Sequence, residues 1–284
     1  MKNPATAPAF SRAQIAQEII ARLDSATIKT VADQFYSSGK TQWFCVDNLL
    51  PKDMADSIYR AFPRSDQMRE RKTIREYKYV AAQMDQFDPQ AEEALFAFHD
   101  TRVVDIISKI TNFPSLVPDP ELYAGGISLM GRGNFLNPHL DNSHNSDKSI
   151  YRALNLLYYC SPDWNLQSGG NLELWPNGLK QEPMTIPNIF NRLVVMSTGH
   201  DSWHSVSKVN IDSPRCCVSN YYFSPDPIGG DPYFRVTSFR GRPEQPLRDL
   251  VLRADSATRQ TLRKFLPKKM VATSHLYKKP EDKA

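Results

Sequence analysis

Hydrophobic positions recur at helical spacing in three stretches of the first third of the chain. In residues 10–34 they fall three or four positions apart, and Ser11 stands before the first of them as a helix N-cap. Residues 51–62 and 89–110 also predict helices, and the first of these opens on a proline that suits a first helical turn. A short strand is expected at 41–46. We expect these helices to support a core formed by the rest of the chain.

From about Glu121 onward, short runs of β-branched and aromatic residues alternate with turn-forming residues. The runs predict seven strands, at residues 126–130, 150–160, 171–175, 181–186, 192–197, 203–209 and 216–223. Strands of this length and spacing are typical of an antiparallel sandwich or barrel. A last helix is expected at 245–265. Because no repeat or linker interrupts the pattern, the sequence predicts a single helix-flanked β domain over residues 1–284.

One segment fits neither the helical nor the strand pattern. Residues 65–79 are polar and densely charged, with few apolar positions to bury. Such a composition permits mobility, so the sequence leaves open whether this segment forms a lid over a site.

The composition is that of a folded protein. Of the 284 residues, 40% are hydrophobic and 11% are aromatic, which excludes a disordered tail. The longest apolar run, residues 153–160, is far shorter than the roughly 20 residues that span a bilayer, so no membrane partner is expected. Because the first ten residues lack the apolar core of an export signal, we expect a cytoplasmic protein.

The charge balance gives no reason to expect a nucleic-acid partner. The chain has 35 lysines and arginines against 31 aspartates and glutamates, and only residues 253–279 are locally basic, which we interpret as a solvated surface. The four cysteines lack zinc or redox spacing and are expected to be free, mostly buried thiols. Two of them, Cys216 and Cys217, are adjacent, so alternation along a strand sends them to opposite faces.

Two of the six histidines lie in surroundings that suit a metal. His139 and Asp141 are two residues apart, so in an extended strand both side chains project from one face. His204 follows 63 residues after Asp141, on a strand that could lie against the first. Two imidazoles and one carboxylate form the facial triad that suits non-haem Fe(II) and leaves coordination positions open. A turn histidine bonded to its neighbouring aspartate is the alternative for His139.

A predicted buried cation supports the metal interpretation. Arg215 opens a strand in which Cys217, Ser219 and Tyr221 share its face. An arginine inside an apolar barrel is costly unless an anion meets it, and its planar fork fits a carboxylate. A dicarboxylic cosubstrate that binds iron at one end and Arg215 at the other would satisfy both groups.

These residues stand within a longer ordered pattern. Besides the His139-x-Asp141 pair, His204 and Arg215, it includes the runs ALNLLYYCSPDW (153–164), GGNLELW (169–175) and NRLVVM (191–196). In this order the motifs resemble the Fe(II)/2-oxoglutarate-dependent dioxygenases of the prolyl-4-hydroxylase-like branch, over residues 115–225. One family tyrosine, expected on the strand before the H-x-D pair, has no counterpart in residues 129–132.

The resemblance implies an α+β, mainly β fold. A double-stranded β-helix, or jelly roll, would occupy 115–225, with helical support in 1–114 and a C-terminal extension with a helix in 226–284. It implies iron ligation by His139, Asp141 and His204, and binding of the distal carboxylate of 2-oxoglutarate by Arg215. The family reaction consumes O2 and couples decarboxylation of 2-oxoglutarate, giving succinate and carbon dioxide, to hydroxylation of an unactivated C–H bond. Ascorbate is expected to stimulate it, and the presence of Asp141 disfavours halogenation.

Other residues are assigned to the site by their place on the predicted strands. Tyr159 stands where a family tyrosine contacts 2-oxoglutarate, and Asn155 shares its strand face; a core aromatic is the alternative for Tyr159. Ser219 and Tyr221 follow Arg215 along its face, where simple packing explains them equally well. The expected substrate contacts are polar: Arg132, Asn134, Asn137, Asn142, His144, His200 and Tyr221.

This polar lining favours a small hydrophilic substrate, such as an amino acid, a sugar or another metabolite. A protein substrate, as in prolyl hydroxylases, is the rival within the same chemistry. A cupin-like metal- or ligand-binding module without catalysis is the alternative from another class, although it would not require Arg215 eleven residues beyond a metal ligand. The oligomeric state is left open.

Overall fold

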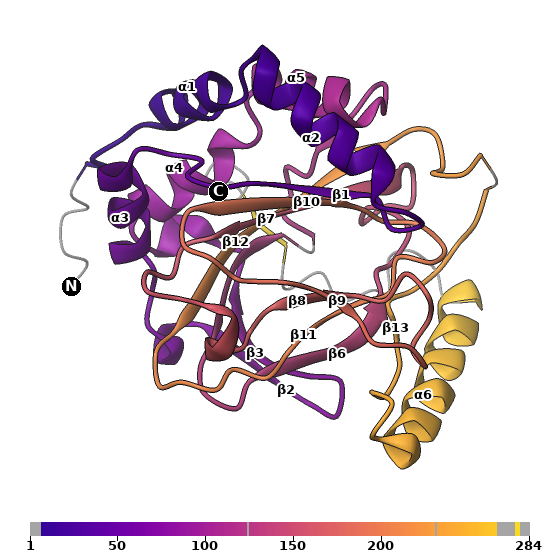
Figure 1. Cartoon of the computed structure of the whole chain (residues 1–284). Coiled ribbons are helices and arrows are strands. Elements are labelled where there is room, and N and C mark those ends of the chain that lie inside the picture. Colours follow the sequence, from indigo (N-terminus) through magenta and orange to yellow (C-terminus); the bar gives the residue numbers. More distant parts are fainter. Residues whose placement is uncertain (1–6, 124, 231, 266–275, 279–284) are drawn as a thin grey trace.

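The computed structural model describes residues 7–123, 125–230, 232–265 and 276–278. Its α-helices are α1 (Arg12–Arg22), α2 (Ser25–Ser37), α3 (Lys52–Arg60), α4 (Pro89–Ala97), α5 (Thr101–Thr111) and α6 (Pro246–Phe265). In Figure 1, α1, α2 and α5 lie over the upper layer of strands, whereas α6 lies at the opposite, lower corner. The helices of the first third thus cover one side of the β core, as the periodicity predicts.

Two of the expected helices are each divided by a capping aspartate. Within residues 10–34, the Asp24 side chain begins α2 by accepting a hydrogen bond from the Thr27 N–H at 2.8 Å. Within residues 89–110, Asp100 begins α5 by accepting from the Arg102 N–H at 2.9 Å. The prediction of one long helix was therefore wrong in both places. A capping carboxylate begins a new helix there, while the apolar residues on both sides of it keep their helical spacing. The Ser11 cap of α1 is confirmed.

All the described strands pair antiparallel. They are β1 (Trp43–Val46), β2 (Arg69–Lys72), β3 (Glu76–Ala81), β4 (Val117–Pro118), β5 (Gly126–Met130), β6 (Phe135–Leu140), β7 (Tyr151–Tyr159), β8 (Leu172–Leu174), β9 (Met184–Ile186), β10 (Arg192–Ser197), β11 (His204–Val206), β12 (Arg215–Ser224) and β13 (Ser238–Phe239). The main order is β1-β10-β7-β12-β5-β3-β6-β11-β8-β9. Figure 1 shows two layers, β1, β10, β7 and β12 above β8, β11, β6 and β3. The predicted double-stranded β-helix and its seven strands are confirmed.

The charged stretch 65–79 is part of the sheet. β2 pairs with β3, and β3 in turn is hydrogen-bonded to β5 through residues 79–81 and to β6 through residues 76–77. β3 therefore joins the two layers. All four residues of β2, RERK, are charged, so hydrophobic periodicity does not predict this strand. Charge on an edge strand protects it from pairing with other chains.

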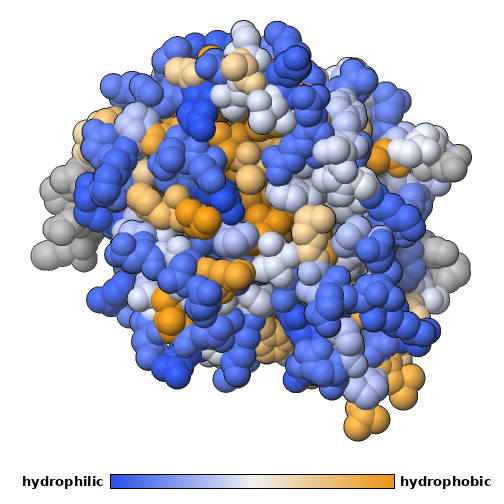
Figure 2. All heavy atoms as spheres, in the orientation of Figure 1, coloured by the Kyte–Doolittle hydropathy of each residue, from blue (hydrophilic) through white to orange (hydrophobic). Residues whose placement is uncertain are grey.

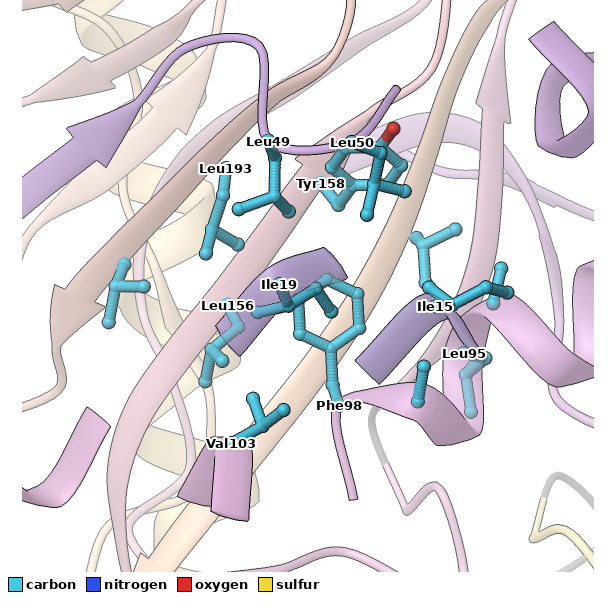
Figure 3. Close-up of a cluster of buried hydrophobic side chains, with 14 of the residues drawn as sticks. Ile15, Ile19, Leu49, Leu50, Leu95, Phe98, Val103, Leu156, Tyr158 and Leu193 are labelled. Atoms are coloured by element: carbon cyan, nitrogen blue, oxygen red, sulfur yellow. The ribbon is translucent and has the colours of Figure 1, made fainter. Parts of the chain in front are cut away.

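The largest apolar core lies between the helices and the outer face of the upper layer (Figure 3). Ile15 and Ile19 of α1 and Phe98 at the end of α4 pack in one cluster with Leu156 of β7 and Leu193 of β10, all at most 2% exposed. Because side chains alternate along a strand, the neighbours of Leu156 project to the other side, between the two layers. The helices thus bury the outer face and leave the inner face for the site.

α6 is attached to the β core by ion pairs. Arg75, in the turn between β2 and β3, forms a bidentate pair with Asp255 of α6, and Arg259 contacts the same carboxylate. Away from these contacts, Leu247 and Leu250 remain 81% and 66% exposed, and Figure 2 shows hydrophobic atoms at the surface in this lower corner. These ion pairs therefore hold the hairpin formed by β2 and β3 against α6.

The four cysteines are free thiols, as expected, with Cys216 in the outer core and Cys217 in the inner cluster. None of the described helices is long and apolar enough to cross a membrane. Of the basic C-terminal segment, Lys268, Lys269 and Lys279 lie outside the described residues.

Candidate metal and cosubstrate site

Two neighbouring strands bring the candidate ligands together. β6 and β11 pair antiparallel, and His139 stands directly opposite His204 in their register. Asp141 follows the last residue of β6, so its side chain returns to the face of His139. All three residues are buried, and one donor atom from each lies within 4.8 Å of the other two. The sequence-predicted triad is therefore assembled in space.

Both histidines are oriented to present the same nitrogen. His139 Nδ1 lies 3.0 Å from the Asn137 carbonyl oxygen, and His204 Nδ1 lies 2.9 Å from that of Ser202. A carbonyl only accepts, so each Nδ1 carries a proton and each ring presents its Nε2 to the site. The two Nε2 atoms lie 3.6 and 3.7 Å from the carboxylate oxygens of Asp141. Backbone carbonyls commonly fix metal-binding imidazoles in this way.

Burial and charge set the protonation states that a metal site requires. Burial, together with the neighbouring His204, lowers the pKa of His139 to about 3, so its imidazole is neutral near pH 7. Burial alone would raise the pKa of Asp141, but Arg152 and the two histidines outweigh it and hold that pKa below its usual value. Asn155 also donates a hydrogen bond to the carboxylate at 2.8 Å. Two imidazoles and one carboxylate are a donor set that suits Fe(II).

The backbone beside the triad is held from the C-terminal extension. Arg235 donates to the carbonyl oxygens of Asp141 at 2.9 Å and of Gly199 at 3.0 Å. Phe239 of β13 stacks on the His139 ring at 5.1 Å between centroids. Neither residue is predictable from the sequence, because the contacts of both depend on how the irregular stretch after β12 folds back.

Arg215 lies in a cradle that fits an anion. Its Nε donates to the Gly170 carbonyl oxygen at 2.6 Å, and its guanidinium carbon lies 5.0 Å from the centre of the Tyr159 ring. The Tyr159 hydroxyl is buried and makes no hydrogen bond within the described residues, and burial raises its pKa, so it stays a donor. An unpaired hydroxyl beside a guanidinium suits a carboxylate, so these residues fit the distal end of 2-oxoglutarate.

One cavity of about 760 Å³ connects these groups. The triad lines it, and so do Arg215, Cys217, Ser219 and Tyr221 from alternate positions of β12 and Asn155 from β7. The predicted alternation of β12 is therefore confirmed. Ser219 and Asn155 lie at the cavity wall, where Asn155 contacts Asp141 and Ser219 pairs with the Cys217 thiol.

Several expected substrate contacts lie elsewhere. Arg132 is outside the cavity, on the surface, paired with Asp212 at 2.8 Å, because the turn after β5 points it to solvent. Asn134 and Asn137 are buried, but their side chains bond the backbone of Gly131 and Ile74. His200 is exposed against Tyr233. The structure does not bring these four residues to the cavity.

His144 and Asn142 belong to a neighbouring pocket. His144 lines a separate pocket of about 290 Å³, where its ring lies against Tyr151 and its Nδ1 meets the Ser143 hydroxyl at 2.7 Å. Asn142 lines both this pocket and the main cavity, and its side-chain oxygen accepts from Arg152 at 2.7 Å. Arg152 is thus a cavity residue that the sequence analysis missed.

A register shift explains why Arg152 was missed. Strict alternation along β7 places residue 152 on the face opposite Asn155. In the structure Tyr222 pairs with Leu154, but the next residue of β12, Phe223, pairs with Arg152. This β-bulge adds one residue to β7 and turns Arg152 back toward the cavity. No turn or glycine signal in the sequence marks the bulge.

The chain resembles known proteins both in sequence and in fold. Residues 125–223 match the family model of the 2OG-Fe(II) oxygenase superfamily. A prolyl-4-hydroxylase from Pseudomonas putida has a TM-score of 0.52 at 16% identity, over 69% of this chain and 98% of its own. A prolyl hydroxylase from Trichoplax adhaerens, in complex with a hypoxia inducible factor peptide fragment, has 0.51 at 19% identity, over 76% and 94%. The non-heme alpha ketoglutarate dependent epimerase SnoN from nogalamycin biosynthesis has 0.50 at 12% identity, over 71% and 84%.

No curated protein matches the sequence. At such low identities the three solved structures show a shared fold, whereas the family match covers the segment that carries the triad, Arg215 and Tyr159. Fold, donor set and family match agree. Residues 125–223 therefore carry a match to the 2OG-Fe(II) oxygenase superfamily, and the residues of this segment fit iron and 2-oxoglutarate.

Proposed function

We propose that this enzyme hydroxylates an unactivated C–H bond of a polar small molecule. Substrate, O2 and 2-oxoglutarate are converted to the alcohol, succinate and carbon dioxide. Iron and 2-oxoglutarate supply the oxidising chemistry when they are bound. The chain supplies position, charge and a cavity lined by buried residues.

Each proposed role follows from a contact described above. His139, Asp141 and His204 hold the iron through two Nε2 atoms and one carboxylate. Arg215 and the Tyr159 hydroxyl bind the distal carboxylate of 2-oxoglutarate, while Asn155 orients Asp141. Ser219 and Tyr221 complete the wall. The observation that carries the proposal is that three metal donors and a buried arginine line one cavity.

The direct test is an anaerobic titration with Fe(II) and then 2-oxoglutarate, followed by the weak visible charge-transfer band of the chelated metal. The wild type should develop the band, lose it when oxygen is admitted, and release succinate. His139→Ala should lose both signals, and Arg215→Gln should need much more 2-oxoglutarate for the same band. Arg102→Gln, an exposed arginine of α5, is the matched control and should behave as wild type. A metal-loaded wild type without a band would instead favour a ligand-binding module.

A protein substrate is the second candidate. It is favoured by the fold similarity to two prolyl hydroxylases, one of them bound to a peptide. Stimulation of succinate release by proline-containing peptides, but not by free amino acids or sugars, would select it. The cationic residues of the cavity support the small-molecule proposal. Stimulation by free amino acids or sugars, but not by the peptides, would select that substrate class.

A further inference from the structure

Arg152 is a fully buried cation that is only partly satisfied. Its side chain is 1% exposed, and one terminal nitrogen donates to Asn142 at 2.7 Å. Its Nε and Nη1 make no hydrogen bond within the described residues. Nη1 lies 3.5 Å from an Asp141 oxygen, close enough for attraction. Burying a guanidinium costs free energy unless its N–H groups are hydrogen-bonded, so Arg152 has N–H groups that can still bind a ligand.

The surroundings of Arg152 hold its guanidinium in one plane. The Tyr221 ring centre lies 4.0 Å from its central carbon, and the Phe223 ring centre lies 5.9 Å away. Rings that stack on a guanidinium fix its orientation without using its N–H groups. The fork is therefore positioned for a planar or tetrahedral oxyanion.

The position of Arg152 separates it from the cosubstrate end of the cavity. Arg152 pairs with Phe223 on β12, eight residues beyond Arg215 on the same strand. The Arg152 guanidinium lies over the Tyr221 ring and beside Asp141. Tyr221 is six residues beyond Arg215, and six residues of extended strand span roughly 20 Å, so Arg152 lies at the triad and not beside Arg215. The cavity thus has a buried arginine toward each end of β12, with the triad on the facing layer.

The cavity as a whole is cationic. Its lining includes seven lysines and arginines but only two carboxylates, Glu76 and Asp141. A third carboxylate, Asp255, pairs with Arg75 and Arg259 of this lining, which still leaves more cations than carboxylates. Four of the cations, Arg69, Arg71, Arg75 and Lys78, come from the β2–β3 hairpin. Fe(II) and 2-oxoglutarate carry opposite charges of equal size, so binding both leaves the excess positive charge of the cavity unchanged. A cationic cleft concentrates anionic ligands.

We infer that the substrate carries an oxyanion, a carboxylate or a phosphate, which Arg152 binds at the end of the cavity opposite Arg215. This inference rests on the proposed function and narrows the substrate class. Arg152 would act through Nε and Nη1, which make no hydrogen bond within the described residues although Nη1 lies 3.5 Å from Asp141. The hairpin cations would attract the ligand. The β-bulge in β7 is the local feature that places the arginine there.

The test has a binding arm that needs no turnover. Mn(II) and 2-oxoglutarate are added first to occupy the triad and Arg215, and calorimetry then follows titration with acetate or with methyl phosphate. Wild type should bind either acetate or methyl phosphate. The one that binds shows whether the oxyanion of the substrate is a carboxylate or a phosphate. Arg152→Gln should bind it roughly tenfold or more weakly, since hydrogen bonds to a charged group are lost. Arg152→Lys, which keeps the charge without the fork, should fall between them.

A screen by succinate release provides the second arm. It uses matched pairs that differ only in charge: amino acids against their amides, and sugar phosphates against their parent sugars. Only the anionic members should stimulate the wild type, and this preference should fall in Arg152→Gln and Arg152→Lys but not in Arg102→Gln. If neither anion binds, or if Arg152→Gln binds as well as wild type, the inference is wrong.

The same titrations separate this failure from failure of the proposed function. If 2-oxoglutarate does not bind with Mn(II), the proposed function fails, and titrating acetate and methyl phosphate into the metal-free protein still decides whether Arg152 binds an oxyanion. Circular dichroism of each variant checks folding, and Arg152→Lys decides the case if Arg152→Gln does not fold.

Discussion

At the scale of single residues, the position of Arg215 depends on the absence of a side chain at Gly170. Gly170 has a φ of +65°, and a Cβ at this position would lie 2.7 Å from Cδ of Arg215. We expect Gly170→Ala to displace Arg215 and weaken 2-oxoglutarate binding roughly tenfold or more, because the charged hydrogen bonds lose their geometry. Gly178→Ala is the control, since Gly178 has a φ of +81° but open space around its Cα. Equal affinities in the two variants would contradict the prediction.

His99 makes folding stability depend on pH. Burial lowers its pKa to about 4, while its Nε2 lies 2.8 Å from the Asn220 side-chain oxygen. Between pH 6.5 and 4 the unfolded chain binds a proton that the folded chain does not, so stability falls as the pH falls through this range. From pH 7.5 to 4.5, His99 should contribute about 2 kcal/mol to the loss in the free energy of unfolding. Urea denaturation of His99→Gln should show a loss smaller by that amount; identical losses would exclude this role for His99.

At the scale of elements, α1 is a structural support. Ile19 is fully buried in the cluster of Figure 3, between the helices and the upper layer. Ile19→Ala should lower the free energy of unfolding by about 3 kcal/mol, through lost burial and the cavity left behind. Leu250→Ala on α6, where the side chain is 66% exposed, should change it by less than about 0.5 kcal/mol. Urea denaturation measures both, and similar effects would mean that α1 is not packed as described.

Predictability also differs between elements. Strands with strict alternation, such as β12, were placed correctly together with the face that Arg215 and Cys217 occupy. The triad was predictable because His139 and Asp141 are neighbours in sequence and His204 lies on the adjacent strand. Arg152 was not, since a bulge is a tertiary adjustment that reverses the alternation. The hairpin and Arg235 were missed because neither has apolar periodicity, and long-range contacts position both.

At the scale of the whole molecule, occupancy of the cavity should stabilise the fold. The site draws residues from both layers, so ligands that bind only the folded chain shift the unfolding equilibrium. At concentrations of Mn(II) and 2-oxoglutarate about 100 times their dissociation constants, the gain is about 2.7 kcal/mol, or a rise in Tm of about 5–8 °C. Differential scanning calorimetry should detect this rise in wild type, lose it on adding a chelator, and not find it in His139→Ala. An unchanged Tm in wild type would contradict it.

The thiol of Cys217 has a further consequence for an enzyme that handles oxygen. It faces the cavity beside Ser219, and burial raises its pKa, so it remains protonated at neutral pH. Peroxide and related oxidants attack thiolates much faster than thiols. The Cys217 thiol in the cavity wall is therefore in its less reactive form, and we expect peroxide to oxidise it slowly.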